Sequence, residues 1–310
     1  MKKQIAIISG PSSLAKSSNV AKAMNAEIVP TDLKIYSDGE NRIRITKHIE
    51  GKNCVIIQST YPPTDRHLLQ ALMLIKNCVD DRAANIIVVI PYMAYARQDK
   101  AFLEGEVVSM DLVAKLLEVC GTKQFITVDI HSRLALSYFT ISAFDLSSIP
   151  LLANYSANML KLDNNDLPLI VSPDYGGIRR AQDFSRILKT DMIALKKTRD
   201  RRTGQIFIDE KEMDPKLVKN RDAIIVDDII STGGTIAEAC KTLKKNGSGK
   251  VYAMCTHALL IGDSANKIKA AGIEEIIATN SVSNNEFAKV DVSPVICEAL
   301  GTLIEDASSS

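Results

Sequence analysis

Short, continuous apolar runs rich in β-branched residues recur along this sequence, separated by longer amphipathic stretches. The clearest runs are Ile5–Ile8, Cys54–Ile57, Ile86–Ile90, Phe125–Val128, Leu169–Val171, Ala223–Val226, Val251–Cys255 and Glu275–Ala278. Continuous apolarity, in place of strict alternation, is typical of strands that are covered on both faces. The stretches between them carry apolar residues at helical spacing, as in Leu68, Leu69, Leu72 and Ile75. The pattern predicts βαβ units and therefore a doubly wound α/β fold with a mostly parallel sheet.

Two pairs of these runs lie at nearly the same separation along the chain. Ile7-Ile8-Ser9-Gly10 stands 163 residues before Ile170-Val171-Ser172-Pro173, and Val55–Ile57 stands 169 residues before Ile224–Val226. In both pairs a strand opens into a loop and then a helix. A chance match between generic strands is the alternative to a duplicated domain. We expect duplication, with an N-terminal domain over 1–150 and a C-terminal domain over 151–310, because a chain of 310 residues can bury two cores.

Charge and cysteine content restrict the possible partners. Lys plus Arg number 38 against 37 Asp plus Glu, so the net charge of +1 creates no field that would hold a nucleic acid. No apolar run approaches the roughly 20 residues that span a bilayer, so we expect no membrane partner and a cytoplasmic location. The six cysteines show no metal-binding spacing and predict buried thiols in a reducing compartment.

The most informative motif is an acidic strand end followed by a glycine-rich turn. Asp227 and Asp228 come directly after the run Ala223–Val226, and the turn that enters the next helix consists of Ser231, Thr232, Gly233, Gly234 and Thr235. Two glycines let successive N–H groups surround an anion at a helix N-terminus. The two carboxylates can accept hydrogen bonds from vicinal sugar hydroxyls, so the motif predicts a pentose phosphate ligand. The alternative is an acidic strand end before a capped helix, which would leave the carboxylates without a partner.

Three other segments carry chemistry of their own. Pro173-Asp174-Tyr175-Gly176-Gly177 combines glycines with a carboxylate that can hold a hard cation such as Mg²⁺. The stretch Tyr92–Lys100 could stack a planar base on aromatic rings and bring Arg97 to a phosphate. Lys196–Arg202 packs five cations into seven residues and predicts a solvated loop that closes over a triphosphate. Ser37-Asp38-Gly39-Glu40 by itself predicts only a turn.

The acidic glycine motif resembles the phosphoribosyl-pyrophosphate loop shared by phosphoribosyltransferases and ribose-phosphate pyrophosphokinases. Further segments resemble the ribose-phosphate pyrophosphokinases in that family's order: Ser37–Glu40, Tyr95–Lys100, Val128–Ser132, Ser172–Gly177 and Lys197–Arg199. The resemblance covers nearly the whole chain. It implies two similar domains of phosphoribosyltransferase-like type, with ATP and subunit contacts in the first and the ribose 5-phosphate and pyrophosphate loops in the second.

The same resemblance implies roles for single residues. Lys197 would be the catalytic lysine with Arg199 as its companion, and His131 and Asp174 would be ligands or near-ligands of Mg²⁺, with Asp129 orienting His131. The implied ATP-binding residues are Asp38, Gly39, Glu40, Arg97, Gln98, Asp99 and Lys100. The implied ribose-5-phosphate-binding residues are Arg199, Asp227, Asp228, Ser231, Thr232, Gly233, Gly234 and Thr235. Two positions depart from the family pattern: Ser231 stands where many members carry Asp, and Thr140 stands where some relatives carry an acid.

The implied activity is transfer of the diphosphoryl group of Mg-ATP to the anomeric hydroxyl of ribose 5-phosphate, with 5-phosphoribosyl 1-pyrophosphate and AMP as products. The cofactor would be Mg²⁺, the partners ATP and ribose 5-phosphate, and the assembly a homo-oligomer built from dimers. No GxxxxGK[ST] loop is present, which excludes P-loop kinases. Two alternatives remain open. A phosphoribosyltransferase would not need Arg97, Gln98 or Lys197, and a non-catalytic regulatory homologue would have lost its reactive residues.

Overall fold

The computed structural model describes the chain except for residues 1–3, 162–166, 200–205, 210–213, 284–285 and 310, and it describes only the backbone of 197–199, 206–209 and 305–309. The chain divides into two units. The first comprises Met1–Ser147, Ser281–Ser283 and Asp291–Ser310, and the second comprises Ser148–Asn280 and Asn284–Val290. The chain passes from the first unit to the second between Ser147 and Ser148. The C-terminal segment 291–310, however, packs in the first unit and not with the rest of 151–310.

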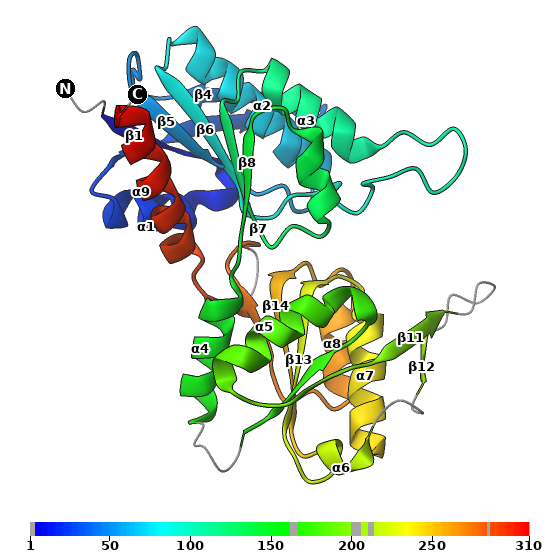
Figure 1. Cartoon of the computed structure of the whole chain (residues 1–310). Helices are drawn as coiled ribbons and strands as arrows, with labels where there is room; N and C mark the ends of the chain where they lie inside the picture. Colours follow the sequence, from blue (N-terminus) through cyan, green and yellow to red (C-terminus); the bar gives the residue numbers. More distant parts are fainter. Residues whose placement is uncertain (1–3, 162–166, 200–205, 210–213, 284–285, 310) are drawn as a thin grey trace. The chain divides into compact units, whose positions relative to one another are not determined.

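The first unit is built on a parallel sheet with the strand order β2-β1-β5-β6-β7-β8 (Figure 1). Its strands are β1 (Ile5–Ser9), β2 (Glu27–Val29), β5 (Asn53–Ile57), β6 (Asn85–Ile90), β7 (Gln124–Val128) and β8 (Ser142–Leu146). Side chains alternate between the two faces, so Ile8 and Ile56 enter one core while Ile7 and Val55 enter the other. Both faces are buried, which explains why these strands appear in the sequence as unbroken apolar runs.

Two pairs of helices cover the faces of this first sheet (Figure 1). The helices α2 (Thr64–Asp80) and α3 (Ser109–Val119) pack on one face through side chains such as Leu74 and Leu117. The helices α1 (Leu14–Ala23) and α9 (Ser293–Ser309) pack on the other, where Val20 and Ile296 join the core. The C-terminal helix therefore completes the core of the unit in which the chain begins.

The second unit repeats this arrangement, with a parallel sheet in the order β10-β9-β13-β14-β15-β16. Its strands are β9 (Leu169–Ser172), β10 (Met192–Ala194), β13 (Ala223–Ile230), β14 (Val251–Ala258), β15 (Ile276–Thr279) and β16 (Ala288–Val290). One face is covered by α7 (Gly234–Lys245) and α8 (Ser264–Ala270), and the other by α4 (Ile149–Leu160) and α5 (Ile178–Leu188). The short helix α6 (Pro215–Val218) precedes β13.

The two sheets share their topology. In each sheet the second strand in sequence lies at the edge, the first strand lies beside it, and the other four follow in sequence order. Strand β1 therefore corresponds to β9, and β5 corresponds to β13. Each unit also inserts an antiparallel hairpin after its second strand: β3 (Thr31–Ile35) with β4 (Asn41–Ile45), and β11 (Lys196–Arg199) with β12 (Ile206–Asp209). The predicted fold class, two similar doubly wound parallel-sheet domains, is confirmed, and the pairs of strands with matching offsets occupy equivalent positions.

Two local expectations are wrong. Strand β13 continues to Ile230, so Asp227 and Asp228 lie within the strand and not beyond its end. Lys196–Arg199 pairs with β12 as strand β11 and is not a loop, while the cations at 201 and 202 lie outside the described residues.

Among the residues that the structure describes, no helix combines the length and the apolar character needed to cross a membrane. The cysteines are free thiols, of which Cys54, Cys78, Cys240 and Cys255 are buried while Cys120 and Cys297 are partly exposed.

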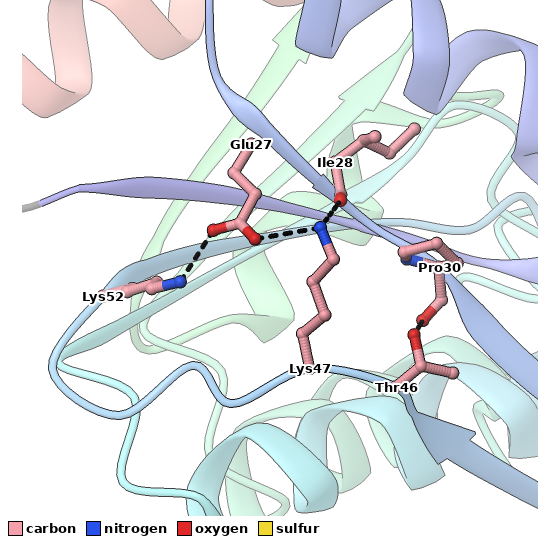
Figure 2. A network of polar contacts seen from close by, with 6 residues as sticks. All are labelled: Glu27, Ile28, Pro30, Thr46, Lys47 and Lys52. Carbon is pink, nitrogen blue, oxygen red and sulfur yellow. Dashed lines mark hydrogen bonds and ion pairs between the residues drawn. The ribbon is translucent and has the colours of Figure 1, made fainter.

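A charged cluster anchors the β3–β4 hairpin to the edge of the first sheet (Figure 2). Glu27 on β2 accepts hydrogen bonds from Lys52 Nζ at 2.7 Å and from Lys47 Nζ at 3.0 Å. Lys47 Nζ also donates to the carbonyl of Ile28 at 3.2 Å. These contacts, with the hydrogen bond from Lys52 as the largest cause, lower the pKa of Glu27. Because Lys47 follows β4, the cluster holds the base of the hairpin whose tip carries Asp38, Gly39 and Glu40.

Candidate functional site

The candidate site lies at the carboxyl edge of the second sheet, between β9 and β13. These two strands are parallel neighbours. From β9 the chain continues to β10 on one side, and from β13 it continues to β14 on the other. Ligands of open parallel sheets bind outside the carboxyl ends of the strands at such a reversal of strand order. Both phosphate-type segments start here: the β9 loop (Ser172–Gly177) and the glycine turn (Ser231–Thr235).

The glycine turn is shaped by Gly233. This residue has a φ of +72°, and a Cβ atom added to it would lie 2.8 Å from the side chain of Ile268 on α8. A residue with a side chain would therefore be strained at this position and would also collide with α8. Gly233 caps α7, whose first turn contains no acid, so the positive end of the helix dipole faces the turn. Thr232 is exposed and Ser231 and Thr235 are half-buried, which suits a turn that surrounds an anion.

The acid pair Asp227 and Asp228 has a cationic partner in Arg180 on α5. Arg180 Nη1 lies 3.6 Å from Asp227 Oδ1, and Arg180 Nη2 lies 3.5 Å from Asp228 Oδ2. The amide of Asp228 also donates to Asp227 Oδ1 at 2.9 Å. Burial, followed by the neighbouring Asp228 carboxylate, raises the pKa of Asp227, and Arg180 opposes that rise. In the sequence, Asp227 and Asp228 have no evident partner, which argues against a purely structural role. In the structure Arg180 is their partner, so that argument no longer applies.

The β9 loop is a tight turn around Asp174. Ser172 Oγ donates to the carbonyl of Asp174 at 2.7 Å, and the amide of Gly177 donates to Asp174 Oδ1 at 3.3 Å. A Cβ atom on Gly177 would lie 2.7 Å from Ser172 Oγ and 3.4 Å from Arg180 Nη1, so a side chain at this position would displace the Ser172 hydroxyl. Asp174 also contributes to raising the pKa of Asp227. Among the described residues, no group of three or more His, Cys, Asp or Glu side chains is placed to hold a metal ion, so Asp174 offers a single carboxylate to a cation such as Mg²⁺, which keeps several waters and shares phosphate oxygens.

In the first unit, the predicted ATP segment and His131 leave the carboxyl ends of neighbouring parallel strands, β6 and β7. Two residues next to them have left-handed backbone, Tyr95 with a φ of 65° and Asp129 with a φ of 42°. Backbone strain of this kind in non-glycine residues clusters at functional sites. The hydroxyl of Tyr138, which lies in the 3-10 helix Arg133–Tyr138 after β7, donates to the carbonyl of Asp99 at 2.5 Å. The structure therefore brings the segments that follow β6 and β7 together.

Glu106 organises the segment after β6. Its Oε2 accepts hydrogen bonds from the amides of Phe102 at 2.7 Å and Leu103 at 3.0 Å, and from Gln98 Nε2 at 3.3 Å. The backbone hydrogen bonds, with Phe102 as the largest cause, lower the pKa of Glu106. One carboxylate thus joins a predicted ATP-binding side chain to the backbone of the same loop.

The remaining predicted residues are distributed as follows. Arg97, Lys100 and His131 have exposed side chains, whereas Gln98 and Asp99 are half-buried. Tyr92 is buried in the core, so base stacking on that ring is excluded. Asp38, Gly39 and Glu40 form the exposed tip of the β3–β4 hairpin, where the amide of Glu40 donates to Asp38 Oδ1 at 3.1 Å. Lys197 and Arg199 lie on β11, and their side chains are outside the described residues.

Sequence reasoning missed Arg180 and Glu106. A signal for Arg180 was available, because Arg179 and Arg180 occupy the first turn of α5, where the helix dipole disfavours cations unless carboxylates compensate them. Glu106 gave no comparable signal, since an acid in an exposed loop is ordinary.

The shared topology and the two loops at the strand reversal define an α/β protein of phosphoribosyltransferase type. A crystal structure of phosphoribosylpyrophosphate synthetase from Mycobacterium smegmatis matches with a TM-score of 0.85 and 25% identity, covering 98% of this chain and 100% of that one. A family model described as the N-terminal domain of ribose phosphate pyrophosphokinase matches residues 5–121, and one described as the phosphoribosyl synthetase-associated domain matches residues 209–310.

Curated relatives match over almost their full length. A ribose-phosphate pyrophosphokinase of Sulfurisphaera tokodaii is 31% identical over 296 residues, which is 95% of this chain and 99% of the relative. One of Methanobrevibacter smithii is 38% identical over 284 residues, 89% of this chain and 94% of the relative. The chain belongs to the ribose-phosphate pyrophosphokinase family. The family resemblance and the prediction of an enzyme are thereby confirmed.

Proposed function

We propose that the chain transfers the diphosphoryl group of ATP to the anomeric hydroxyl of ribose 5-phosphate, forming 5-phosphoribosyl 1-pyrophosphate and AMP. The observation that supports this reaction best is the juxtaposition of two phosphate-type loops and an acid pair at one strand reversal of the second sheet. A sugar that carries a phosphate at one end and accepts a pyrophosphate at the other needs both loops. Family membership and the match to a phosphoribosylpyrophosphate synthetase point to the same reaction.

In this proposal the second unit binds the sugar. The N–H groups and hydroxyls of the glycine turn hold the 5-phosphate, helped by the dipole of α7. Asp227 and Asp228 accept hydrogen bonds from the ribose hydroxyls, and the β9 loop holds the incoming pyrophosphate. A side chain at position 177 would displace the Ser172 hydroxyl of this loop. The sugar hydroxyl is thereby presented to the nucleotide without a covalent enzyme intermediate.

Arg97, Gln98, Asp99 and Lys100 bind ATP, together with Asp38, Gly39 and Glu40 of a neighbouring subunit. The anomeric oxygen attacks the β-phosphorus and the hydroxyl proton passes to solvent, while the bond between the β-phosphorus and the α–β bridging oxygen breaks and AMP leaves with that oxygen. Lys197 and Arg199 neutralise the charge that moves onto that oxygen during transfer. Positioning and charge stabilisation of this kind account for most of the rate acceleration in phosphoryl transfer.

Mg²⁺ is the proposed cofactor. The family resemblance implies Asp174 and His131 as its ligands or near-ligands, with Asp129 orienting His131, and so few protein ligands suffice because Mg²⁺ keeps waters and shares phosphate oxygens. When bound, the ion would neutralise the phosphate oxygens of ATP. We further propose a cytoplasmic homo-oligomer built from dimers.

The reaction is tested by incubating the purified chain with ATP, Mg²⁺ and ribose 5-phosphate in the absence of any nucleobase. We expect AMP and 5-phosphoribosyl 1-pyrophosphate to appear in equal amounts. A requirement for a nucleobase, with pyrophosphate as product, would indicate a phosphoribosyltransferase. Binding of 5-phosphoribosyl 1-pyrophosphate without turnover would indicate a regulatory homologue.

A further inference from the structure

We infer that Arg180 is a positioning residue that sets the affinity for ribose 5-phosphate by holding the acid pair and the β9 loop in one arrangement. This inference rests on the proposed function, because it takes ribose 5-phosphate as the ligand of the site. Arg180 itself is not proposed to touch the reacting atoms.

The first argument is the geometry of the guanidinium group. Its two terminal nitrogens face different carboxylates, Nη1 toward Asp227 and Nη2 toward Asp228, at 3.6 Å and 3.5 Å. The side chains are largely buried, with exposed fractions of 16% for Arg180, 17% for Asp227 and 8% for Asp228. A planar, forked cation between two buried carboxylates fixes the direction of both. Removing it would leave two adjacent buried charges without compensation.

The second argument is the contact between Arg180 and the β9 loop. Arg180 Nη1 lies 3.4 Å from the place where a Cβ atom of Gly177 would stand, so the guanidinium packs against the backbone of this loop. The loop follows β9 and the acid pair lies on β13, the neighbouring strand. One side chain of α5 therefore touches both parts of the candidate site. A change at Arg180 would alter the position of the sugar acids relative to the pyrophosphate loop.

Arg179 offers a matched control. It precedes Arg180 in the same first turn of α5, but its side chain is exposed. Replacing either arginine with methionine removes one positive charge from the same helix end. Only the replacement of Arg180 removes the fork between the two carboxylates.

The experiment compares the wild-type chain with R180M, R180K and R179M. The affinity for ribose 5-phosphate is measured by titration calorimetry, and KM for both substrates is measured by AMP formation. For R180M we expect the Kd and KM for ribose 5-phosphate to rise by at least about tenfold, with KM for ATP changed by less than about twofold. R180K keeps the charge but not the fork, so its affinity should lie between wild type and R180M. R179M should match the wild type.

Unchanged ribose 5-phosphate affinity in R180M, or an equal rise of KM for both substrates, would overturn the inference. Thermal unfolding identifies a variant that is merely unstable. If R180M does not fold, R180K decides the question, since wild-type affinity in that variant contradicts a role for the fork. A wild-type chain that binds ribose 5-phosphate but forms no AMP would defeat the proposed function, while the comparison of Kd values would still test Arg180.

Discussion

Lys16 on α1 has a completely buried side chain, and its ammonium group donates a hydrogen bond to Ser283 Oγ in the same unit. Burial lowers the pKa of Lys16 to about 7, against the opposing attraction of Asp291. In the unfolded chain the same group has its ordinary value of 10.5. Between these two values the unfolded state binds more protons than the folded state. The free energy of unfolding therefore rises with pH across this window. Below pH 7 Lys16 is charged in both states, so the full cost of burying its charge destabilises the fold.

The substitution K16M removes this titration. We expect the difference in unfolding free energy, variant minus wild type, to favour the variant most below pH 7. It should then fall by up to about 1.4 kcal/mol per pH unit as the pH rises toward 9. Urea unfolding at pH 6, 7, 8 and 9 measures the difference. The matched control is K22M, which removes the same charge from an exposed position on the same helix. A pH-independent difference for K16M would contradict a neutral buried lysine.

The loop between β6 and α3 shows how a single carboxylate can order a whole connection. The Glu106 carboxylate accepts hydrogen bonds from the amides of Phe102 and Leu103 and from the side chain of Gln98. We propose that Gln98 binds ATP. The substitution E106Q replaces a charged acceptor with a weaker neutral one, so the loop should lose order before the nucleotide arrives. We expect KM for ATP to rise about three- to tenfold while KM for ribose 5-phosphate stays constant.

The control for this prediction is E104Q in the same loop, since the side chain of Glu104 is also exposed. That variant removes the same charge and should behave as wild type. Equal effects of E104Q and E106Q would mean that the net charge of the loop, and not its hydrogen bonds, governs nucleotide affinity. Steady-state kinetics with each substrate varied in turn distinguishes the two outcomes.

The strands that sequence could predict are those covered on both faces, because burial makes them continuous apolar runs. The edge strands β2, β8, β10 and β16 were not predicted. Strands β2, β10 and β16 have only three residues each, and β8 (Ser142–Leu146) has exposed and half-buried residues throughout, so none of them forms a continuous apolar run. The sequence of Lys196–Arg199 predicts a loop and not strand β11, because a cationic strand outside the main sheet has no apolar pattern. Of the candidate site, the sequence motif identified both loops and the acid pair, but not Arg180, since only the packing of α5 against β13 brings this side chain to the acids.

In the whole molecule, the two units share a topology but not the chemistry of their strand reversals. In the first sheet, side chains of the chain itself occupy the space beside the segment that follows β1. Ser12 donates its amide to Gln58 Oε1 at 3.1 Å, and a Cβ atom on Gly10 would lie 2.3 Å from the same oxygen. Gln58 is fully buried, so this reversal leaves little room for a phosphate. The polar tip Asp38–Glu40 of the first unit is exposed.

We expect Asp38 and Glu40 to complete the nucleotide site of a second subunit. The variants K197A and E40A are each expected to lower activity by on the order of a hundredfold or more, because each removes a preorganised group from the site. If sites are shared between subunits, a mixed dimer contains one site with both residues intact. Activity should then return when the two inactive variants are mixed and allowed to exchange subunits, up to about a quarter of the wild-type level for random exchange within dimers. Mass spectrometry of isotopically labelled chains verifies the exchange. Proven exchange with activity remaining at the parental level would show that each chain builds its site alone.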